Sequence, residues 1–271
     1  MRVSAVPRQV FLMLVTLAAL APLTFMLLSS LKSPQDYQAH PLGLPTSPTL
    51  SNYTAALVDL PTLRWALNSL VVTVLSVMIA GVFGALAAYA IAFGRFRGRT
   101  LLLSANIGLI MVPPVVLLLP MFVVMVNLRL VNNLASVVLF YSCLLVPFSV
   151  FFLVNFFRTV PRELIEAGVV DGAGPLRTLW SIVLPLSRPA LVTIAVVNAV
   201  WAWNELLVAL VFLQDEGQRT LMAGLTLLQG RYVTNQPLVL AVATLSILPV
   251  ALFYLLTQRS FVRGLTAGMS K

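Results

Sequence analysis

Six apolar segments, each about 20 residues or longer, dominate this 271-residue sequence and restrict it to one class of fold. They are Val10–Leu31, Trp65–Phe93, Leu101–Asn127, Leu134–Phe157, Ala190–Leu213 and Pro237–Thr257. A helix of about 20 apolar residues spans the hydrocarbon core of a bilayer. With 60% hydrophobic and 9% charged residues, the chain has no room for a separate catalytic soluble domain. We therefore predict an all-α membrane protein with six transmembrane helices, forming a single domain over residues 1–271.

The basic residues support one orientation of these helices. If the N-terminus is cytoplasmic, six crossings return the C-terminus to the same side. Twelve of the 17 basic residues then lie inside: Arg2, Arg8, Arg95, Arg97, Arg99, Arg158, Arg162, Arg177, Arg188, Arg259, Arg263 and Lys271. This asymmetry follows the positive-inside rule, so the net charge of +9 needs no nucleic-acid partner.

Small residues recur within the second segment. Ala80, Gly84 and Ala88 are four residues apart, which places them on one helical face. In lipid, small residues let helix backbones approach closely. We predict that this face packs against another helix and does not contact a substrate.

Prolines interrupt several of the apolar segments. They are Pro113, Pro114 and Pro120 in the third, Pro147 in the fourth and Pro249 in the sixth. Proline removes a backbone donor and kinks a helix. Static kinks that shape the packing and breaks around a transport pathway are both compatible with this pattern.

The residues that catalysis usually requires are scarce. Cys143 is the single cysteine and lies inside an apolar segment, and His40 is the single histidine, in a proline-rich stretch. A zinc site of the HExxH type is excluded, and a Ser-His site is disfavoured. The phosphate-binding pattern GxxxxGK[ST] is absent, so we expect no metal, no cofactor and no ATP hydrolysis in this chain.

The longest polar interruption in the second half covers residues 158–189. Pro161 suits the first turn of a helix, and Gly172 can end it. Pro175 can open a second helix, which Pro185 is expected to break. The sequence predicts two short helices joined by a glycine turn, on the cytoplasmic side between the fourth and fifth transmembrane helices.

Three short motifs within this loop resemble a known family. They are Glu166-Ala167-Gly168, Asp171-Gly172-Ala173 and Ile182-Val183-Leu184-Pro185. The spacing resembles the EAA loop of ABC-importer permeases: EAA, three residues, Gly, nine residues, then I-x-LP. The Asp-Gly-Ala motif is similar to the carbohydrate-uptake branch. Gly168 departs from the family pattern, which has alanine there.

In that family the loop docks into a groove on a cytoplasmic ATPase and transmits its motion. The resemblance therefore implies a coupling site at Glu166, Ala167, Gly168, Asp171, Gly172, Ala173, Ile182 and Pro185. An ordinary amphipathic connector between two membrane helices is the alternative, and the fixed spacing over some twenty residues argues against it.

The fifth segment carries the candidates for a transport pathway: Asn198, Trp201, Asn204 and Glu205. Glu205 is the only acidic residue within an apolar segment, where a charge costs roughly 2.5–3.5 kcal/mol. Asn198, Trp201 and Glu205 would share a helical face, and a polar and aromatic stripe suits a sugar. Alternatively, Trp201 and Trp203 belong to an interfacial belt and Glu205 pairs with a neighbouring subunit. Residues 203–205, Trp-Asn-Glu, resemble a segment common in sugar permeases.

Two further stretches resemble the same family. The tail at 258–271 is similar to that of the shorter permease subunit of maltose-type importers, which reaches into the ATPase dimer interface. The matching residues are Gln258, Arg259, Gly264, Leu265, Thr266, Ala267 and Gly268. The segment Leu50–Leu57, within the loop Lys32–Arg64, is similar to the first outside region of sugar permeases, which implies contact with a solute-binding protein. A loose basic tail and a solvated loop are the alternatives.

The resemblance implies a non-catalytic permease subunit of a bacterial ABC importer for a carbohydrate, in the inner membrane. Its implied partners are a second permease, an ATPase dimer that holds ATP and Mg²⁺, and an extracytoplasmic binding protein. A permease for another solute, such as a polyol or a glycerol-phosphate diester, is the runner-up. An ion-coupled secondary transporter would need several intramembrane charges and an internal repeat. An intramembrane enzyme would need a catalytic constellation that the sequence lacks.

Overall fold

The computed structural model describes residues 5–231 and 235–267, and these residues form helices and loops without strands. The helices are α1 (Ala5–Ser30), α2 (Pro34–Ala39), α3 (Ser51–Val58), α4 (Thr62–Phe93), α5 (Arg99–Ile110), α6 (Pro114–Asn127), α7 (Leu134–Phe157), α8 (Arg162–Val170), α9 (Pro175–Thr178), α10 (Leu184–Leu186), α11 (Arg188–Asn204), α12 (Leu207–Phe212), α13 (Leu221–Arg231) and α14 (Gln236–Ala267). A π-helical turn, η1 (Leu179–Val183), joins α9 to α10, and a 3-10 turn, η2 (Glu216–Gln218), precedes α13. The predicted all-α class is confirmed.

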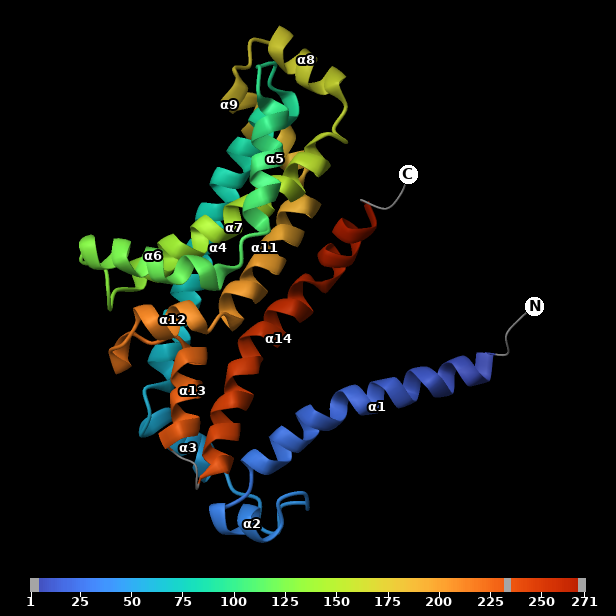
Figure 1. Ribbon diagram of the computed structural model, residues 1–271. Helices are drawn as coiled ribbons and strands as arrows, with labels where there is room; N and C mark the ends of the chain where they lie inside the picture. The colour runs from blue at the N-terminus through green and yellow to red at the C-terminus, as the bar shows by residue number, and fades with distance from the viewer. Residues whose placement is uncertain (1–4, 232–234, 268–271) are drawn as a thin grey trace.

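The centre of the molecule is the pair α4 and α7, against which α11 packs (Figure 1). Ala80 and Ala88 of α4 are fully buried. A methyl group added at Gly84 would lie 2.7 Å from Cβ of Ser149 on α7. The stripe of small residues is therefore the contact that brings these two helices together, as its spacing predicts.

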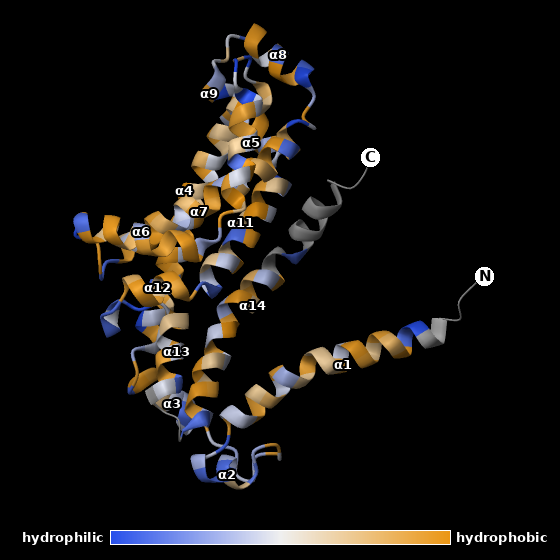
Figure 2. Cartoon of the chain, viewed as in Figure 1, coloured by the Kyte–Doolittle hydropathy of each residue, from blue (hydrophilic) through white to orange (hydrophobic). Residues whose placement is uncertain are grey.

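Four single helices in the described residues are long and apolar enough to cross a membrane. They contain Arg8–Ser30, Thr62–Phe93, Leu134–Phe157 and Gln236–Leu255. Two further crossings are possible only if each of two bent helix pairs counts as one span. Figure 2 shows the hydrophobic residues along most of α1, which projects away from the rest of the chain and exposes its apolar side chains.

The third predicted segment, Leu101–Asn127, is not one straight helix. α5 ends at Ile110, α6 begins at Pro114, and the two axes are bent by 95°. Pro113 and Pro114 have no backbone N–H, so the α5 hydrogen-bond ladder cannot continue through them. The prolines therefore redirect the chain where hydropathy alone predicts one crossing.

The fifth predicted segment, Ala190–Leu213, is also divided. α11 ends at Asn204, Glu205 has an extended backbone (φ −68°, ψ 129°), and the short α12 follows. The Glu205 carboxylate accepts hydrogen bonds from the amides of Leu207 and Val208, which lie in the first turn of α12. An acceptor placed before a helix start stabilises that start, so Glu205 favours a new helix over continuation of α11.

Candidate functional site

The loop between α7 and α11 contains the predicted first helix. α8 begins after Pro161, not after a hydrogen-bonding cap, and Glu163 lies in its first turn, where a carboxylate favours the positive helix end. Of its nine residues only Gly168 is buried. Figure 1 shows α8 and α9 together at one end of the molecule, beyond the long helices.

Gly168 is buried because α8 rests on η1. A methyl group built on Gly168 would lie 2.7 Å from Cδ1 of Ile182. The two sequence motifs that contain these residues are thus in direct contact. A side chain much larger than alanine at position 168 would hold the two segments apart.

The turn after α8 is closed by backbone hydrogen bonds. The amide of Ala173 donates to the carbonyl of Gly168 (2.9 Å), and that of Gly172 donates to the carbonyl of Val169 (3.0 Å). Gly172 has φ +78°, in the left-handed region that glycine adopts readily. Glycine thus ends α8, as its position predicts.

The second helix of the loop does not break at Pro185. It runs from Pro175 to Leu186 through η1, and the chain bends by 82° between this pair and α11. A π-helical turn widens the ladder just before Pro185, where a proline would clash with the carbonyl of an ordinary α-helix. The break lies instead at Ser187, between α10 and α11.

η1 anchors the loop in the helix bundle. Leu179 and Val183 are buried with residues of α4, α7 and α11. In α8, α9 and η1, several large apolar side chains remain exposed: Leu164, Val169, Val170, Leu176 and Trp180. Val170 is 87% exposed, and the neighbouring Glu166, Ala167 and Asp171 are exposed as well. An exposed apolar surface rimmed by polar groups is typical of a protein-binding site.

The structure places three of the candidate pathway residues in different surroundings. Asn198 is buried and donates through Nδ2 to Oγ of Ser149 (2.9 Å). Asn204 is exposed and folds back to donate to the carbonyl of Val200 (2.7 Å). Glu205 has left the helix, so the predicted common face of Asn198, Trp201 and Glu205 is wrong for Glu205.

Tyr141 of α7 joins Glu205 to Trp201. Its hydroxyl donates to Oε2 of Glu205 (2.5 Å), and its ring packs edge-on against Trp201 with centroids 5.4 Å apart. The sequence reasoning missed both Tyr141 and Ser149. The available signal was their polar groups inside the fourth apolar segment, which need partners when buried.

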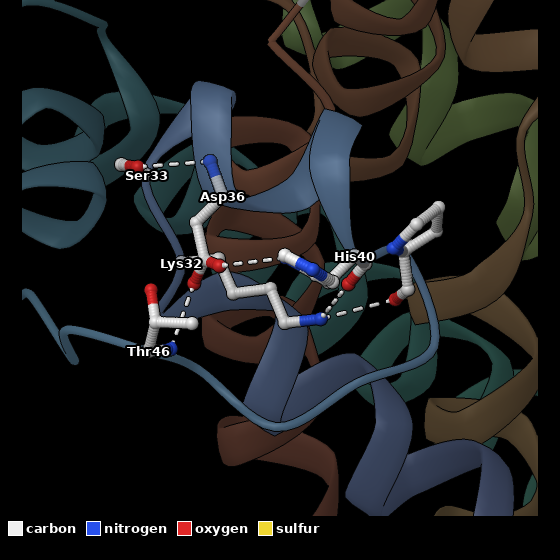
Figure 3. Close-up of polar contacts among 6 residues, drawn as sticks. Lys32, Ser33, Asp36, His40 and Thr46 are labelled. Atoms are coloured by element: carbon white, nitrogen blue, oxygen red, sulfur yellow. Dashed lines mark hydrogen bonds and ion pairs between the residues drawn. The ribbon is translucent and has the colours of Figure 1, made fainter.

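The loop from α1 to α3 is folded around a buried lysine (Figure 3). Lys32 is 0% exposed, and its Nζ donates to the carbonyls of His40 (2.7 Å) and Pro41 (3.1 Å). Asn52, within the motif at 50–57, donates to the carbonyls of Ser30 and Lys32 (both 2.8 Å). Asn52 therefore fixes the loop against the end of α1.

Asp36 closes the same loop from the other side. Its Oδ2 accepts a hydrogen bond from the amide of Thr46 (3.0 Å), and Oδ1 lies 3.9 Å from Nδ1 of His40 (Figure 3). The Thr46 hydrogen bond lowers the pKa of Asp36 below its ordinary value, against a raising effect of burial, and the charge of Lys32 lowers it further.

The backbone of the predicted tail continues α14 to Ala267. Among the tail side chains only that of Gln258 lies in the described part; it is exposed. The side chains of Arg259, Leu265, Thr266 and Ala267, with Gly264, lie outside it, as does Gly268 altogether.

Comparison with known families matches residues 80–266 to the family described as binding-protein-dependent transport system inner membrane component. The match covers α8, η1, α11 and nearly all of α14. The chain belongs to this family. It is a transport permease, as the motifs in the loop at 158–189 predicted.

Curated relatives cover nearly the whole permease. The permease is 36% identical over 250 residues to the sulfoquinovosyl glycerol transport system permease protein SmoH of Agrobacterium fabrum. The alignment covers 92% of the permease and 88% of that protein. The permease is 30% identical over 259 residues to the melibiose/raffinose/stachyose import permease protein MelC of Bacillus subtilis, covering 95% of the permease and 94% of that protein.

A solved structure shares the fold of the permease. One chain of a bacterial ABC transporter involved in the import of the acidic polysaccharide alginate aligns with a TM-score of 0.81 and 26% sequence identity. The alignment covers 96% of the permease and 97% of that chain. The fold of the permease as a whole is therefore that of a chain from a known ABC importer.

Proposed function

We propose that this permease is one transmembrane subunit of an ATP-driven importer for a carbohydrate. Its relatives are named for sulfoquinovosyl glycerol and for melibiose, raffinose and stachyose, and the structural neighbour for alginate. The compounds in all of these names are carbohydrates or carbohydrate derivatives. This favours a sugar over an unrelated polyol as the transported solute. The chain itself is the non-catalytic part, and ATP and Mg²⁺ belong to a partner.

The exposed end formed by α8 and α9 is the surface on which an ATPase docks. The contact between Gly168 and Ile182 carries this proposal, because it links the exposed α8 directly to η1. η1 in turn is buried against α4, α7 and α11. A force applied to Glu166 and its neighbours therefore reaches the start of α11 across a short, closely packed path.

Orientation follows from charge. The end of the molecule with α8 and α9 also carries seven arginines: Arg95, Arg97, Arg99, Arg158, Arg162, Arg177 and Arg188. By the positive-inside rule this end faces the cytoplasm, where the ATPases are, and both termini lie on the same side. The loop around Lys32 then faces outward, toward a solute-binding protein.

The remaining partners complete the pathway. A second permease would cover the exposed apolar side chains of α1, and the lipid bilayer would cover the rest of the apolar surface. The tail residues of α14 would extend toward the ATPase dimer.

The test is import by the complete transporter in proteoliposomes. Maltose, trehalose, raffinose and sulfoquinovosyl glycerol are supplied with the binding protein, and sugar import and ATP hydrolysis are both measured. Glu166→Lys is expected to lower import while the subunit still inserts and assembles. Asp215→Lys, a charge reversal on an exposed acidic residue before η2, is the matched control. Import at the wild-type rate with Glu166→Lys would refute the coupling role.

A further inference from the structure

The second helix of the loop at 158–189 lies across the end of the long helices. It runs from Pro175 to Leu186 through α9, η1 and α10, and its axis is turned by 82° from that of α11. α11 packs along α4 and α7, which are long enough to span a bilayer. Because transmembrane helices stand close to the bilayer normal, a helix nearly perpendicular to them lies close to the bilayer plane.

The buried side of this helix gives its depth. Leu179 and Val183 pack in one cluster with Phe93 and Phe157, which are the last residues of α4 and α7. The apolar segments predicted from the sequence end at the same two phenylalanines. The helix Pro175–Leu186 therefore lies at the level where the spanning helices pass from the bilayer into water.

The exposed side of the helix carries large apolar side chains next to arginines. Leu176 and Trp180 are 64% and 58% exposed, and a spacing of four residues places them on one helical face. Leu186, in α10, is also exposed. Arg177 and Arg188, which are adjacent to this apolar set in the sequence, are exposed as well. Tryptophan and leucine beside basic residues are typical of a helix that lies in the membrane interface.

The two helices of the loop have opposite net charge. Residues 172–189 contain two arginines and no acidic residue, whereas residues 162–171 contain one arginine and three carboxylates, those of Glu163, Glu166 and Asp171. Neither Arg177 nor Arg188 forms an ion pair within the described residues 5–231 and 235–267. Anionic phospholipids of the cytoplasmic leaflet attract basic residues near the membrane surface and repel carboxylates. The charges thus direct the second helix, and not α8, toward the bilayer.

We propose that the exposed face of the helix Pro175–Leu186 binds anionic phospholipids of the cytoplasmic leaflet, an assignment that rests on the orientation proposed above. Trp180 lies among the headgroups, and Leu176 reaches the upper part of the acyl chains. Arg177 and Arg188 pair with lipid phosphates. This assignment narrows the ATPase surface to α8 and its carboxylates, so the two helices divide the exposed end of the molecule between protein and lipid.

The test reads the fluorescence of Trp180 in the complete transporter, reconstituted in vesicles of phosphatidylcholine and phosphatidylglycerol. Part of the lipid carries bromine near the top of the acyl chain, where bromine quenches a tryptophan that it contacts. Subtracting the emission of the Trp180→Phe transporter isolates Trp180 from all other tryptophans of the complex. This difference is expected to fall about twofold in brominated vesicles, because interfacial tryptophans lie at the headgroup level.

A second comparison tests the charge of the lipid. Bromine is placed either on phosphatidylglycerol or on phosphatidylcholine, at the same mole fraction. Brominated phosphatidylglycerol should quench Trp180 more strongly, and the double variant Arg177→Gln with Arg188→Gln should remove this preference. Arg158→Gln with Arg162→Gln is the matched control, because it removes two exposed positive charges near the start of α8 and should keep the preference.

Acrylamide, a quencher dissolved in water, separates the other possible surroundings of Trp180. Quenching by acrylamide but not by brominated lipid would mean that Trp180 faces water, and quenching by neither would mean that the ATPase or the second permease covers it. Either result overturns the lipid contact. Equal quenching by the two brominated lipids, or equal loss of preference in the two arginine variants, would overturn the assignment of anionic lipid to this helix.

Sugar import measured in the same vesicles keeps this inference separate from the proposed function. Import by wild type without quenching of Trp180 by brominated lipid would refute the lipid contact and leave the carbohydrate function standing. Quenching by brominated lipid without import of any of the sugars named above would support the lipid contact and count against the carbohydrate function.

Discussion

Gly168 and Ile182 are so close that a methyl group on the glycine would lie 2.7 Å from Cδ1 of the isoleucine. Gly168 lies on the exposed helix α8, and Ile182 on η1, whose neighbours Leu179 and Val183 are buried in the bundle. Closely packed contacts transmit displacement because they have no free volume to absorb it. We propose this contact as the mechanical link between the surface loop and α11.

The size of the residue at position 168 should control this link. Gly168→Ala should be tolerated, because Cδ1 is the far end of a flexible side chain and alanine favours the helix by about 1 kcal/mol over glycine. Gly168→Leu should push α8 away from η1 and lower sugar import several-fold at unchanged insertion. Adding Ile182→Ala to Gly168→Leu should restore part of the lost import. If the double variant imports no more sugar than Gly168→Leu alone, the two residues act independently.

A substitution at Gly172 tests the turn after α8 through the backbone conformation alone, because an added methyl group makes no new contact there. An added methyl group meets nothing within 4 Å at either Gly172 or Gly174, but only Gly172 has a positive φ, +78°. Gly172→Ala should therefore destabilise the turn by about 1–2 kcal/mol, and Gly174→Ala should not. Hydrogen exchange at the amide of Ala173, which donates to Gly168, measures this directly. Equal exchange in the two variants would contradict the role assigned to the backbone.

The sequence predicted those helices that are defined by residues within the helix or at its ends. The span in α7 follows from its length and apolar content, and α8 from Pro161 and Gly172 at its two ends. Hydropathy carries no information on helix direction, so the bend of 95° after Ile110 could not be predicted from it. The prolines marked the place, but the angle depends on the packing of α5 against α7.

The contacts of the candidate pathway residues could not be predicted from the sequence, for a different reason. Glu205 interacts with Tyr141, and Asn198 with Ser149, across 64 and 49 positions of the chain. Helical spacing relates only residues on the same helix, and it misassigned Glu205 because the helix ends before it. The buried Lys32 was likewise unpredictable, since its partners are backbone carbonyls that any residue provides.

Glu205 is expected to hold α12 in place. Its carboxylate accepts from the amides of Leu207 and Val208 and from the hydroxyl of Tyr141. Glu205→Ala should cost about 1–2 kcal/mol of local stability through the lost helix cap, and Tyr141→Phe less, since it removes one of these bonds. Asp215→Ala is the control, because Asp215 precedes η2 without a side-chain capping bond. The measurement is the thermal unfolding midpoint in detergent; similar shifts for Glu205→Ala and Asp215→Ala would argue against the cap.

The loop around Lys32 should respond to acid through Asp36. Because the Thr46 amide and the charge of Lys32 lower the pKa of this carboxyl group in the folded loop, its contribution to loop stability is complete above the ordinary aspartate pKa. The contribution is lost as the pH falls through the lowered folded pKa. Asp36→Asn has no such titration, so hydrogen exchange at Thr46, corrected for the intrinsic pH dependence, should be faster in the variant at neutral pH and should converge with wild type in acid. Ser33→Ala, which removes the cap of α2 but no ionisable group, should accelerate exchange in the loop at both pH values. A constant difference between wild type and Asp36→Asn across the acid range would mean that the charge of Asp36 does not hold this loop.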